Sequence, residues 1–491
     1  MKRLLTALAL LMGFSLLSAS TIGVATGSCT VDGRPLLFKN RDRTDAWPPD
    51  VIFYLGLAGE YSFVYHNTYS HGHTQARMGI NTAGFGIGNT DSENLQGAGV
   101  GMNNGELIMH ALKYCATIQD FRNMLDSTNG ARRVHAHIGV IDSTGAGSLF
   151  EVDGFTYVEL MVVDSAATMA NTAKFHPNAG PPASGSTSPQ REGRVAELFS
   201  LAPNGVMDYR YFVEEIMQDF SETQAIENMM PVGQYLTNPV ISRYKTVAGA
   251  VIRGCKPGDN PLIESTMWLA MGEPSLSIVL PFFPNVPVTF AFVRPTAGDG
   301  GMAGSTDRMR QLVYSYANGR YGDHWADTYR LVDIRSYTFP LEDSLFHNYE
   351  QQLPVWRSLP AQQAADSMLF WSYRIQMFAK QEYDHIYQLL GVQKPRTEIS
   401  QSTVLLHLYP NPFNGSLRLR YRITRGDSPQ FRIYDVSGRL RWEKQLAPQS
   451  PGWHELELPF SAILPRAGAG IYFVEYRCSG AMRVKKVVYV P

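Results

Sequence analysis

The chain has 491 residues, of which 44% are hydrophobic and 18% charged, and its formal net charge is −1. This length exceeds that of one ordinary hydrophobic core, so two or three domains are expected. The near-zero net charge argues against a nucleic-acid-binding protein, and the four cysteines are too few and too scattered for a disulfide scaffold.

The N-terminus has the pattern of a secretory signal peptide. Met1–Arg3 carries positive charge, Leu4–Leu17 is apolar, and Ser18–Ser20 consists of small residues. This order of charge, hydrophobic run and small residues is typical of a segment that signal peptidase removes. We therefore expect residues 1–19 to be absent from the mature protein, and the protein to be secreted or held at the outer cell surface.

Residues 20–42 are predicted to form a β-hairpin. Two runs of β-branched and apolar residues flank Asp32-Gly33, a dipeptide that accepts the positive φ of a tight turn. If these two residues form the turn, counting back along the arms places Asp42 opposite Gly23. The polar end of the second arm then lies beside the start of the first.

Strands, helices and strands again follow, without the regular alternation of a parallel sheet, which predicts an α+β body over residues 20–304. An amphipathic helix is expected at Asn104–Leu125, with Asn104 as its N-cap, and an exposed loop at the Pro-, Gly- and Ser-rich Pro177–Gly193. Strands are expected at Arg77–Asn89, His135–Val140, Ser148–Val152, Tyr157–Val163, Thr168–Phe175, Thr266–Met271, Ser277–Leu280 and Val288–Val293, and further helices at Arg194–Ser200 and Asp208–Asp219.

Residues 305–398 change character and are predicted to be a helical extension with a linker. Aromatic and methionine residues recur there at helical spacing, a pattern typical of a core or an oligomer face rather than of a cofactor site. We expect this extension to pack on the preceding body or to form a dimer contact. The sequence leaves the oligomeric state open.

Residues 399–491 are predicted to form a small all-β sandwich, because short alternating strands are separated by turn signals about every ten residues. From residue 401 onward, 13 Lys and Arg face 6 Asp and Glu, a net charge of +7, so the first 400 residues carry −8. The elements "YPNPFN", "IYDVSGR" and "GIYFV" resemble the C-terminal type A sorting domain of the type IX secretion system. That resemblance implies recognition by the secretion machinery and passage across an outer membrane.

The motifs "DGRPLLFKNRD" and "GINTAGFGIGN", preceded by a small nucleophile and Thr, also resemble a family of enzymes. This family comprises the N-terminal-nucleophile (Ntn) amidohydrolases of the choloylglycine hydrolase, penicillin acylase and acyl-CoA:6-aminopenicillanate acyltransferase (peptidase C45) group. The resemblance covers roughly residues 20–300. It implies a four-layer αββα body, no cofactor, and an acyl-enzyme on the first residue of the mature chain.

Three residues are candidates for that nucleophile, whose own α-amine titrates at roughly 7.7 to 8 and acts as the base. Cleavage after Ala19 exposes Ser20, which the hairpin places near Asp42, whereas cleavage after Ser20 exposes Thr21. Cys29 remains a candidate because the family more often has Cys. It lies near the turn, however, roughly 20 Å from the Asp42 end of the hairpin at about 3.3 Å per residue.

The remaining roles are implied by the resemblance alone. Asp42 matches the carboxylate that holds the α-amine, and Lys39 stands where many members have a substrate-binding Arg. Lys keeps the charge but lacks the two-pronged guanidinium. Asn89 matches a residue of the oxyanion hole, Asn171 the second active-site Asn, and Arg243 the late Arg.

Two His-x-His pairs raise the alternative of a zinc-dependent hydrolase. His71 and His73, like His135 and His137, alternate along a chain of strand character, so each pair shares a face. No Cys or acidic residue recurs at metal-ligand spacing, so no metal site is expected.

The sequence therefore predicts an exported amidase or acylase that hydrolyses a linear, non-peptide amide of a small molecule. An acyltransferase that uses the same acyl-enzyme is an alternative, because water or an amine can accept the acyl group. A surface-binding protein on a degenerate scaffold of this kind is the other alternative.

Overall fold

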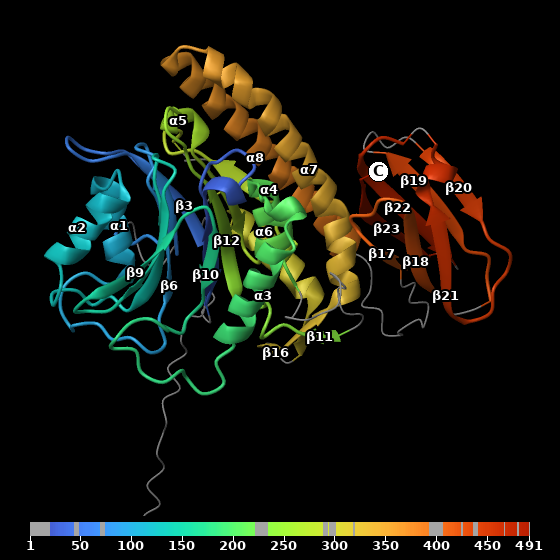
Figure 1. Cartoon of the computed structure of the whole chain (residues 1–491), viewed down its shortest axis with the longest axis horizontal. Helices are drawn as coiled ribbons and strands as arrows, with labels where there is room; N and C mark the ends of the chain where they lie inside the picture. Colours follow the sequence, from blue (N-terminus) through green and yellow to red (C-terminus); the bar gives the residue numbers. More distant parts are fainter. Residues whose placement is uncertain are drawn as a thin grey trace, which may run out of the picture. The chain divides into compact units, whose positions relative to one another are not determined.

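The computed structural model separates into two compact units, residues 1–391 and 392–491, drawn in Figure 1. It describes residues 20–43, 49–68, 74–220, 234–287, 293, 301–317, 320–391, 406–423, 426–435, 440–465, 467–478 and 481–490. The fold is mixed α+β, as the order of elements in the sequence predicts.

The first sheet of the larger unit is antiparallel and has the strand order β10-β1-β2-β12-β13-β14. Its strands are β1 (Ser20–Ala25), β2 (Leu36–Asp42), β10 (Ala166–Met169), β12 (Thr246–Arg253), β13 (Thr266–Met271) and β14 (Leu280–Phe282). Every residue of β2 is buried, because the strand is central in this sheet and contacts β6 and β7 of the second sheet and residues 212–217.

The second sheet is an antiparallel meander in chain order. Its strands are β3 (Pro49–Tyr54), β4 (Phe63–Thr68), β5 (Met78–Asn81), β6 (Gly86–Asp91), β7 (Ala136–Ile141), β8 (Gly147–Val152) and β9 (Tyr157–Val162). The single strand expected at Arg77–Asn89 is wrong. Gly84 has φ +83°, and Asn81 Oδ1 accepts from the main-chain N–H of Ala83, so the segment turns back and forms two strands.

The two sheets pack face to face, and glycines of the second sheet allow the close approach. A Cβ added at Gly139 would lie 2.9 Å from Leu37 and 3.0 Å from Ile22, which belong to the first sheet. Val64, Met78 and Ile80 of the second sheet share one hydrophobic core with Ile22 and Leu37. Any larger residue at 139 would therefore separate the layers that carry the site.

Helices α1 (Asn104–Tyr114) and α2 (Ile118–Ser127) cover the other face of the second sheet (Figure 1). The sequence predicts one helix here, capped by Asn104; both points are wrong. Asn103 is the N-cap, and a second cap interrupts the helix, because Thr117 and Asp120 form a capping box that starts α2. Cys115 is buried at the end of α1, and burial raises the pKa of its thiol to about 12.

The remaining helices of this unit contact the first sheet or its loops. They are α3 (Ser188–Ser200), α4 (Tyr209–Tyr211), which continues as the π-helical turn Phe212–Met217, α5 (Pro261–Glu264), α6 (Gly301–Val313), α7 (Thr328–Ser358) and α8 (Ala361–Gly391). The loop expected at Pro177–Gly193 is wrong at its end, because α3 already begins at Ser188. The strand expected at Ser277–Leu280 is found at Leu280–Phe282, and the one at Val288–Val293 lies almost wholly outside the described residues.

Residues 305–398 are not helical throughout. A third, small sheet takes two strands from this stretch, and it consists of β11 (Gln234–Leu236), β15 (Tyr314–Ala317) and β16 (Arg320–Asp327). The long helices α7 and α8 pack on the first sheet through aromatic side chains. The ring of Trp268 on β13 lies 5.2 Å from that of Tyr349 on α7, and Trp356 lies 5.2 Å from Trp371 on α8.

Glu342 on α7 makes the stability of this unit dependent on pH. Its carboxyl accepts from Gln218 Nε2 at 3.0 and 3.1 Å and from the main chain of Val279 at 2.7 Å. Burial raises its pKa from 4.5 to about 8; Glu214 adds to this, whereas the hydrogen bonds and Arg335 oppose it. The neutral form thus stabilises the fold fully below pH 4.5, and this contribution is lost as the pH rises through about 8.

We therefore expect the free energy of unfolding to fall between pH 5 and 9 by up to about 4 kcal/mol through this group. The variant Glu342→Gln should lose most of that dependence and be more stable than the unchanged chain at pH 9. Urea unfolding at several pH values measures both. Parallel pH profiles for the two proteins would contradict the expectation.

The smaller unit contains two antiparallel sheets around one core. One sheet has β17 (Leu406–Tyr409), β18 (Ser416–Ile423) and β21 (Gly452–Pro459); the other has β20 (Leu440–Gln445), β19 (Gln430–Asp435), β22 (Gly470–Cys478) and β23 (Ala481–Tyr489), and a short helix, α9 (Phe460–Ile463), follows β21. Within the "YPNPFN" motif, Phe413 is buried and exchanges main-chain hydrogen bonds with Val488 and Val490, while Asn411 Oδ1 accepts from Val488. The motif thus fastens the start of this unit to its last strand.

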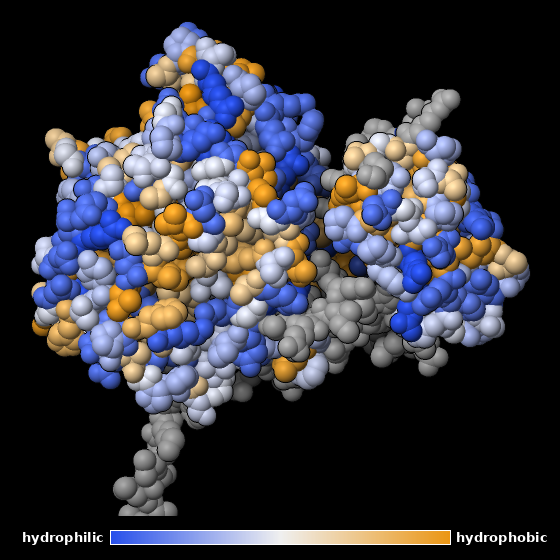
Figure 2. All heavy atoms as spheres, viewed as in Figure 1, coloured by the Kyte–Doolittle hydropathy of each residue, from blue (hydrophilic) through white to orange (hydrophobic). Residues whose placement is uncertain are grey.

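Figure 2 shows hydrophobic side chains gathered in the central part of one face of the larger unit, with mostly hydrophilic side chains toward its edges. Such a mixture is normal for the surface of a folded protein. Among the described residues, none of the helices combines the length and hydrophobicity needed to cross a bilayer.

Candidate active site

The β1–β2 hairpin brings the two ends of the predicted site together in a different register from the expected one. Ser20 pairs with Arg41 and Gly23 pairs with Phe38, so the prediction that Gly23 lies opposite Asp42 is wrong. The arms do not close at Asp32-Gly33, because Cys29 and Val31 instead bond to the main chain of Met207. The wider loop shifts the register and brings Asp42 next to Ser20.

Ser20 is the first residue of β1 and is only 4% exposed. Its main-chain nitrogen donates to Asn171 Oδ1 at 2.9 Å, and its Oγ accepts from the main chain of Asp42 at 3.4 Å. Asn171 Nδ2 in turn donates to Thr90 Oγ1 at 2.8 Å and to the Asp91 carbonyl at 2.6 Å. The side-chain oxygen of Asn171 is thereby directed at the nitrogen that cleavage after residue 19 would convert into an α-amine.

Arg191 on α3 is a site residue that the sequence reasoning missed. Its Nη2 donates to Asn171 Oδ1 at 2.8 Å, and its Nη1 donates to the Ser20 carbonyl and, at 2.6 Å, to Thr21 Oγ1. Burial lowers the pKa of Arg191 to about 9, and neighbouring Arg243 adds to this shift. Because a nearby cation favours the neutral form of an amine, Arg191 would help to keep an α-amine at Ser20 unprotonated.

Asp42 and Arg243, 201 residues apart, form a buried ion pair. The Nε and Nη2 atoms of Arg243 lie 2.9 and 2.6 Å from Asp42 Oδ2, and Thr246 Oγ1 donates to Asp42 Oδ1 at 2.7 Å. Both side chains are 2% exposed. The contact that the resemblance assigns to Asp42, with the α-amine, is made here by Asn171, while Asp42 binds Arg243.

Lys39 and Asn89 form the part of the site between the two sheets. Lys39 Nζ donates to Asn89 Oδ1 at 3.0 Å and to the Arg77 carbonyl at 2.9 Å, and Asn89 Nδ2 donates to Asp91 Oδ1 at 3.2 Å. Burial holds the pKa of Lys39 well below its ordinary value, and the charges of Arg41 and Arg77 add to this shift. Ser20 is thus bonded to Asp42 and Asn171, Lys39 is bonded to Asn89, and Asn89 and Asn171 both donate to Asp91.

The other two candidate nucleophiles lie elsewhere. Cys29 belongs to the loop at the far end of the hairpin, where its thiol donates to the Asp164 carbonyl at 3.4 Å. Thr21 lies next to Ser20, but its hydroxyl accepts from Arg191 on the opposite side of β1. Ser20 is therefore the candidate whose side chain and main-chain nitrogen both meet the predicted site residues.

His135 and His137, the histidine pair within the described residues, are not arranged around a common centre. His71 and His73 lie outside the described residues. His135 Nδ1 lies 3.2 Å from the Ser92 carbonyl, whereas His137 Nδ1 contacts the carbonyl of Ala170. In the part of the chain that the structure describes, no group of three His, Cys, Asp or Glu side chains could hold a metal ion.

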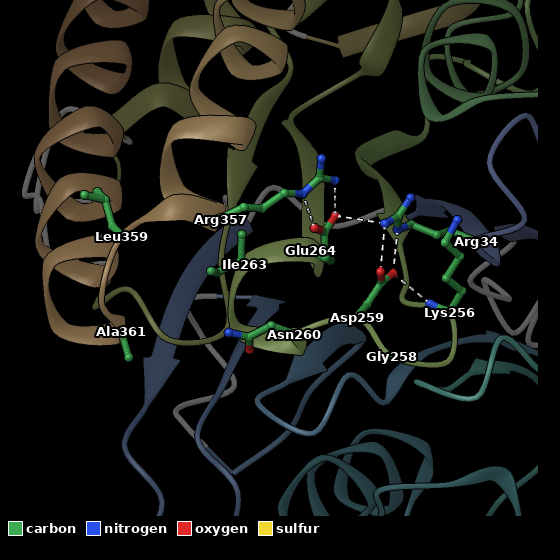
Figure 3. A pocket seen from close by; sticks show the side chains of 10 residues that line it. All are labelled: Arg34, Lys256, Gly258, Asp259, Asn260, Ile263, Glu264, Arg357, Leu359 and Ala361. Carbon is green, nitrogen blue, oxygen red and sulfur yellow. Dashed lines mark hydrogen bonds and ion pairs between the residues drawn. The ribbon is translucent and has the colours of Figure 1, made fainter.

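A separate pocket of about 550 Å³ lies beyond the turn end of the hairpin (Figure 3). Arg34 there binds Asp259 at 2.7 Å and Glu264 at 3.3 Å, and Arg357 binds Glu264 at 2.5 Å. With Lys256, three cations line the pocket against two carboxylates; since both arginines are paired and the pocket lies away from Ser20, it is not our candidate site.

Comparisons with known proteins give likenesses of structure only. No protein-family model matches the chain, and no curated protein matches its sequence. Among solved structures, penicillin V acylase from Agrobacterium tumefaciens (14% identity, TM-score 0.32) matches over 54% of this chain and 86% of its own. A mutant conjugated bile acid hydrolase from Clostridium perfringens (10% identity, TM-score 0.36) matches over 54% and 92%.

Latent PorU from Porphyromonas gingivalis (22% identity, TM-score 0.16) matches over 18% of this chain, which spans only 9% of that protein. All three TM-scores lie below 0.5. We therefore base the function proposed below on the contacts within this chain.

Proposed function

We propose that this chain is an exported amidase of the N-terminal-nucleophile type, with an αββα catalytic body, and that Ser20 is its nucleophile after removal of residues 1–19. The observation that carries this proposal is the environment of Ser20. Its nitrogen donates to Asn171 Oδ1 at 2.9 Å, beside a hydroxyl that lies 3.4 Å from the Asp42 N–H, and all three residues are buried.

The chemistry follows from these positions. Once signal peptidase has cut after Ala19, the new α-amine of Ser20 takes the proton of its own Oγ as the latter attacks the amide carbonyl. The tetrahedral intermediate expels the amine, which leaves with that proton, and water then hydrolyses the acyl ester on Ser20. Asn171 Oδ1 holds the α-amine, Arg191 fixes Asn171 and the Ser20 carbonyl, and Asn89 is our candidate to stabilise the oxyanion.

The C-terminal unit supports the proposed destination. Its "YPNPFN", "IYDVSGR" and "GIYFV" elements resemble a type IX sorting domain, so we propose that this unit directs the protein to the secretion machinery. The acyl ester can also pass to an amine instead of water, and hydroxylamine competition measures how readily it does so.

The mature N-terminus tests the proposal. We expect N-terminal sequencing and intact mass of the exported protein to give a chain that begins at Ser20, and a fluorophosphonate probe to label that residue. A start at Cys29 would overturn the assignment of Ser20. A start at any residue other than Ser20, Thr21 or Cys29, with no labelling, would favour the non-catalytic surface-binding protein.

A further inference from the structure

A group of cationic side chains lies between the two sheets, beside Ser20. Lys39 and Arg41 lie two residues apart on β2 and therefore point to the same face. That face meets the second sheet, because a Cβ on Gly88 of β6 would touch both Lys39 and its strand partner Ile22 at 3.5 Å. Ser20 pairs with Arg41, so its side chain lies on the same face.

The second sheet adds two further groups. His66 of β4 alternates with Val64, whose side chain lies in the core between the sheets. Arg77 precedes β5, and its carbonyl binds Lys39 Nζ at 2.9 Å. Burial lowers the pKa of His66, and the charges of Arg41 and Lys39 add to this shift, as expected for groups that share one site.

Lys39 Nζ is hydrogen-bonded and Arg77 Nη2 donates to Gln75, but other donor nitrogens of this group are buried without a partner. Arg41 is only 5% exposed, and its Nη1 has no hydrogen-bond partner among the described residues; the same holds for Arg77 Nε and for both ring nitrogens of His66. An unpaired buried guanidinium is costly. Elsewhere in the same unit, the buried Arg34, Arg194 and Arg243 each bind a carboxylate within 3.0 Å.

Asp91 favours the charged forms of Lys39, Arg41 and Arg77, but among the described residues its side chain is hydrogen-bonded elsewhere. Asp42 binds Arg243, and Asp91 accepts from Asn104 at 2.6 Å and from Asn89 at 3.2 Å. Burial lowers the pKa of both Lys39 and Arg41, the charge of Arg77 adds to both shifts, and Asp91 opposes them. Buried donor nitrogens without acceptors, on cations that outnumber the carboxylates near them, are conditions that favour the binding of an oxyanion.

We propose that Arg41, Arg77 and His66, with Lys39, bind an oxyanion carried by the substrate, a carboxylate or a phosphate. This inference rests on the proposed function for the identity of the ligand as a substrate. Arg41 lies across the strand pair from Ser20, at a Cα separation of about 5 Å. The oxyanion is therefore within a few bonds of the scissile amide, and the substrate class is that of small anionic amides.

Anion binding can be tested without any measurement of activity. The melting temperature of the mature protein is compared in sodium phosphate, sodium acetate and sodium chloride at equal ionic strength, for the unchanged chain, Arg41→Gln and Arg418→Gln. The last is a matched control, because Arg418 is exposed and lies in the other unit. A bound anion raises the melting temperature by an amount that grows with the logarithm of its concentration divided by its Kd.

We expect phosphate or acetate to stabilise the unchanged chain and Arg418→Gln, and to bind Arg41→Gln at least about tenfold more weakly. The better of the two anions identifies the charged group. Arg41→Gln should fold at least as well as the unchanged chain in chloride, because it removes a buried cation that repels Arg77 and Arg43. No stabilisation by either anion, or equal stabilisation of Arg41→Gln, would overturn the subsite.

Kinetics then connects the subsite to the reaction. For an amide with a carboxylate near the scissile bond, Arg41→Gln should raise KM. When the same carboxylate is converted to its methyl ester, the substitution should not change the kinetics of amide hydrolysis. If Ser20→Ala kept full amidase activity while the anion still bound, the proposed function would fail and the anion-binding subsite would stand. If hydrolysis were equal for acid and ester in both proteins, the anion would not belong to the substrate.

Discussion

Ser20→Ala is expected to lower amidase activity by at least about a thousandfold and to abolish labelling by a fluorophosphonate probe. The substitution removes one hydroxyl, the atom that attacks the amide, while the main-chain hydrogen bond from residue 20 to Asn171 is kept. Alanine is also a small residue, so cleavage by signal peptidase should continue at the same bond.

Two variants make this result specific. Cys29→Ala removes the rival nucleophile and should leave activity unchanged, because Cys29 lies in the loop at the far end of the hairpin. Ser20→Cys restores a nucleophile and should retain activity and gain sensitivity to thiol-alkylating reagents. Loss of activity in Cys29→Ala but not in Ser20→Ala would identify Cys29 as the nucleophile. Full activity of both variants would contradict the proposed mechanism. The intact mass of each variant shows whether its mature chain begins at the same residue as the unchanged chain.

Asp42→Asn is expected to destabilise the larger unit by about 3–5 kcal/mol. The substitution keeps the shape of the side chain but removes the charge that neutralises Arg243, which is buried and lies 2.6 Å away. Breaking a buried ion pair from one side leaves the other charge without compensation, a larger loss than the net contribution of the pair. Urea unfolding followed by tryptophan fluorescence measures the change, since Trp268, Trp356 and Trp371 all lie in this unit.

The control for this variant is an ion pair of the same kind at the surface. Arg418 and Glu457 lie 4.0 Å apart and are more than half exposed, so Glu457→Gln should change the free energy of unfolding by less than about 1 kcal/mol. The double variant Asp42→Asn, Arg243→Gln should regain part of the lost stability, because no unpaired charge remains. Equally small changes in the free energy of unfolding for Asp42→Asn and Glu457→Gln would show that burial of the Asp42–Arg243 pair does not increase the cost of breaking it.

The hairpin shows how far the sequence could lead. Alternating apolar residues around Asp32-Gly33 correctly predict two antiparallel arms and the proximity of Ser20 to Asp42. The register could not be predicted, because it depends on main-chain bonds to Met207, a partner about 175 residues away in the chain that no local pattern reveals.

The rest of the candidate site follows the same division. Asn171 and Arg243 were suggested by resemblance to a family, and only the folded chain brings them to Ser20 and Asp42. Arg191 escaped notice because its surroundings are rich in Pro, Gly and Ser, which favours an exposed loop. Its burial arises from the packing of α3 against β1 and β10, and a charged residue at the start of a helix carries no local sign of such burial.

The central position of β2 also determines where this protein can tolerate change in length. Lys39 and Arg41 face the second sheet, while Asn40 and Asp42 bond to residues on the opposite side. One inserted residue within β2 would exchange the two faces of the strand. It would move the cations away from Ser20 and, at the same time, move Asp42 away from Arg243. The loop at residues 26–35 lies outside the β1–β2 pairing, so a change in length there is compatible with the site as long as the bonds of Cys29 and Val31 to Met207 are kept.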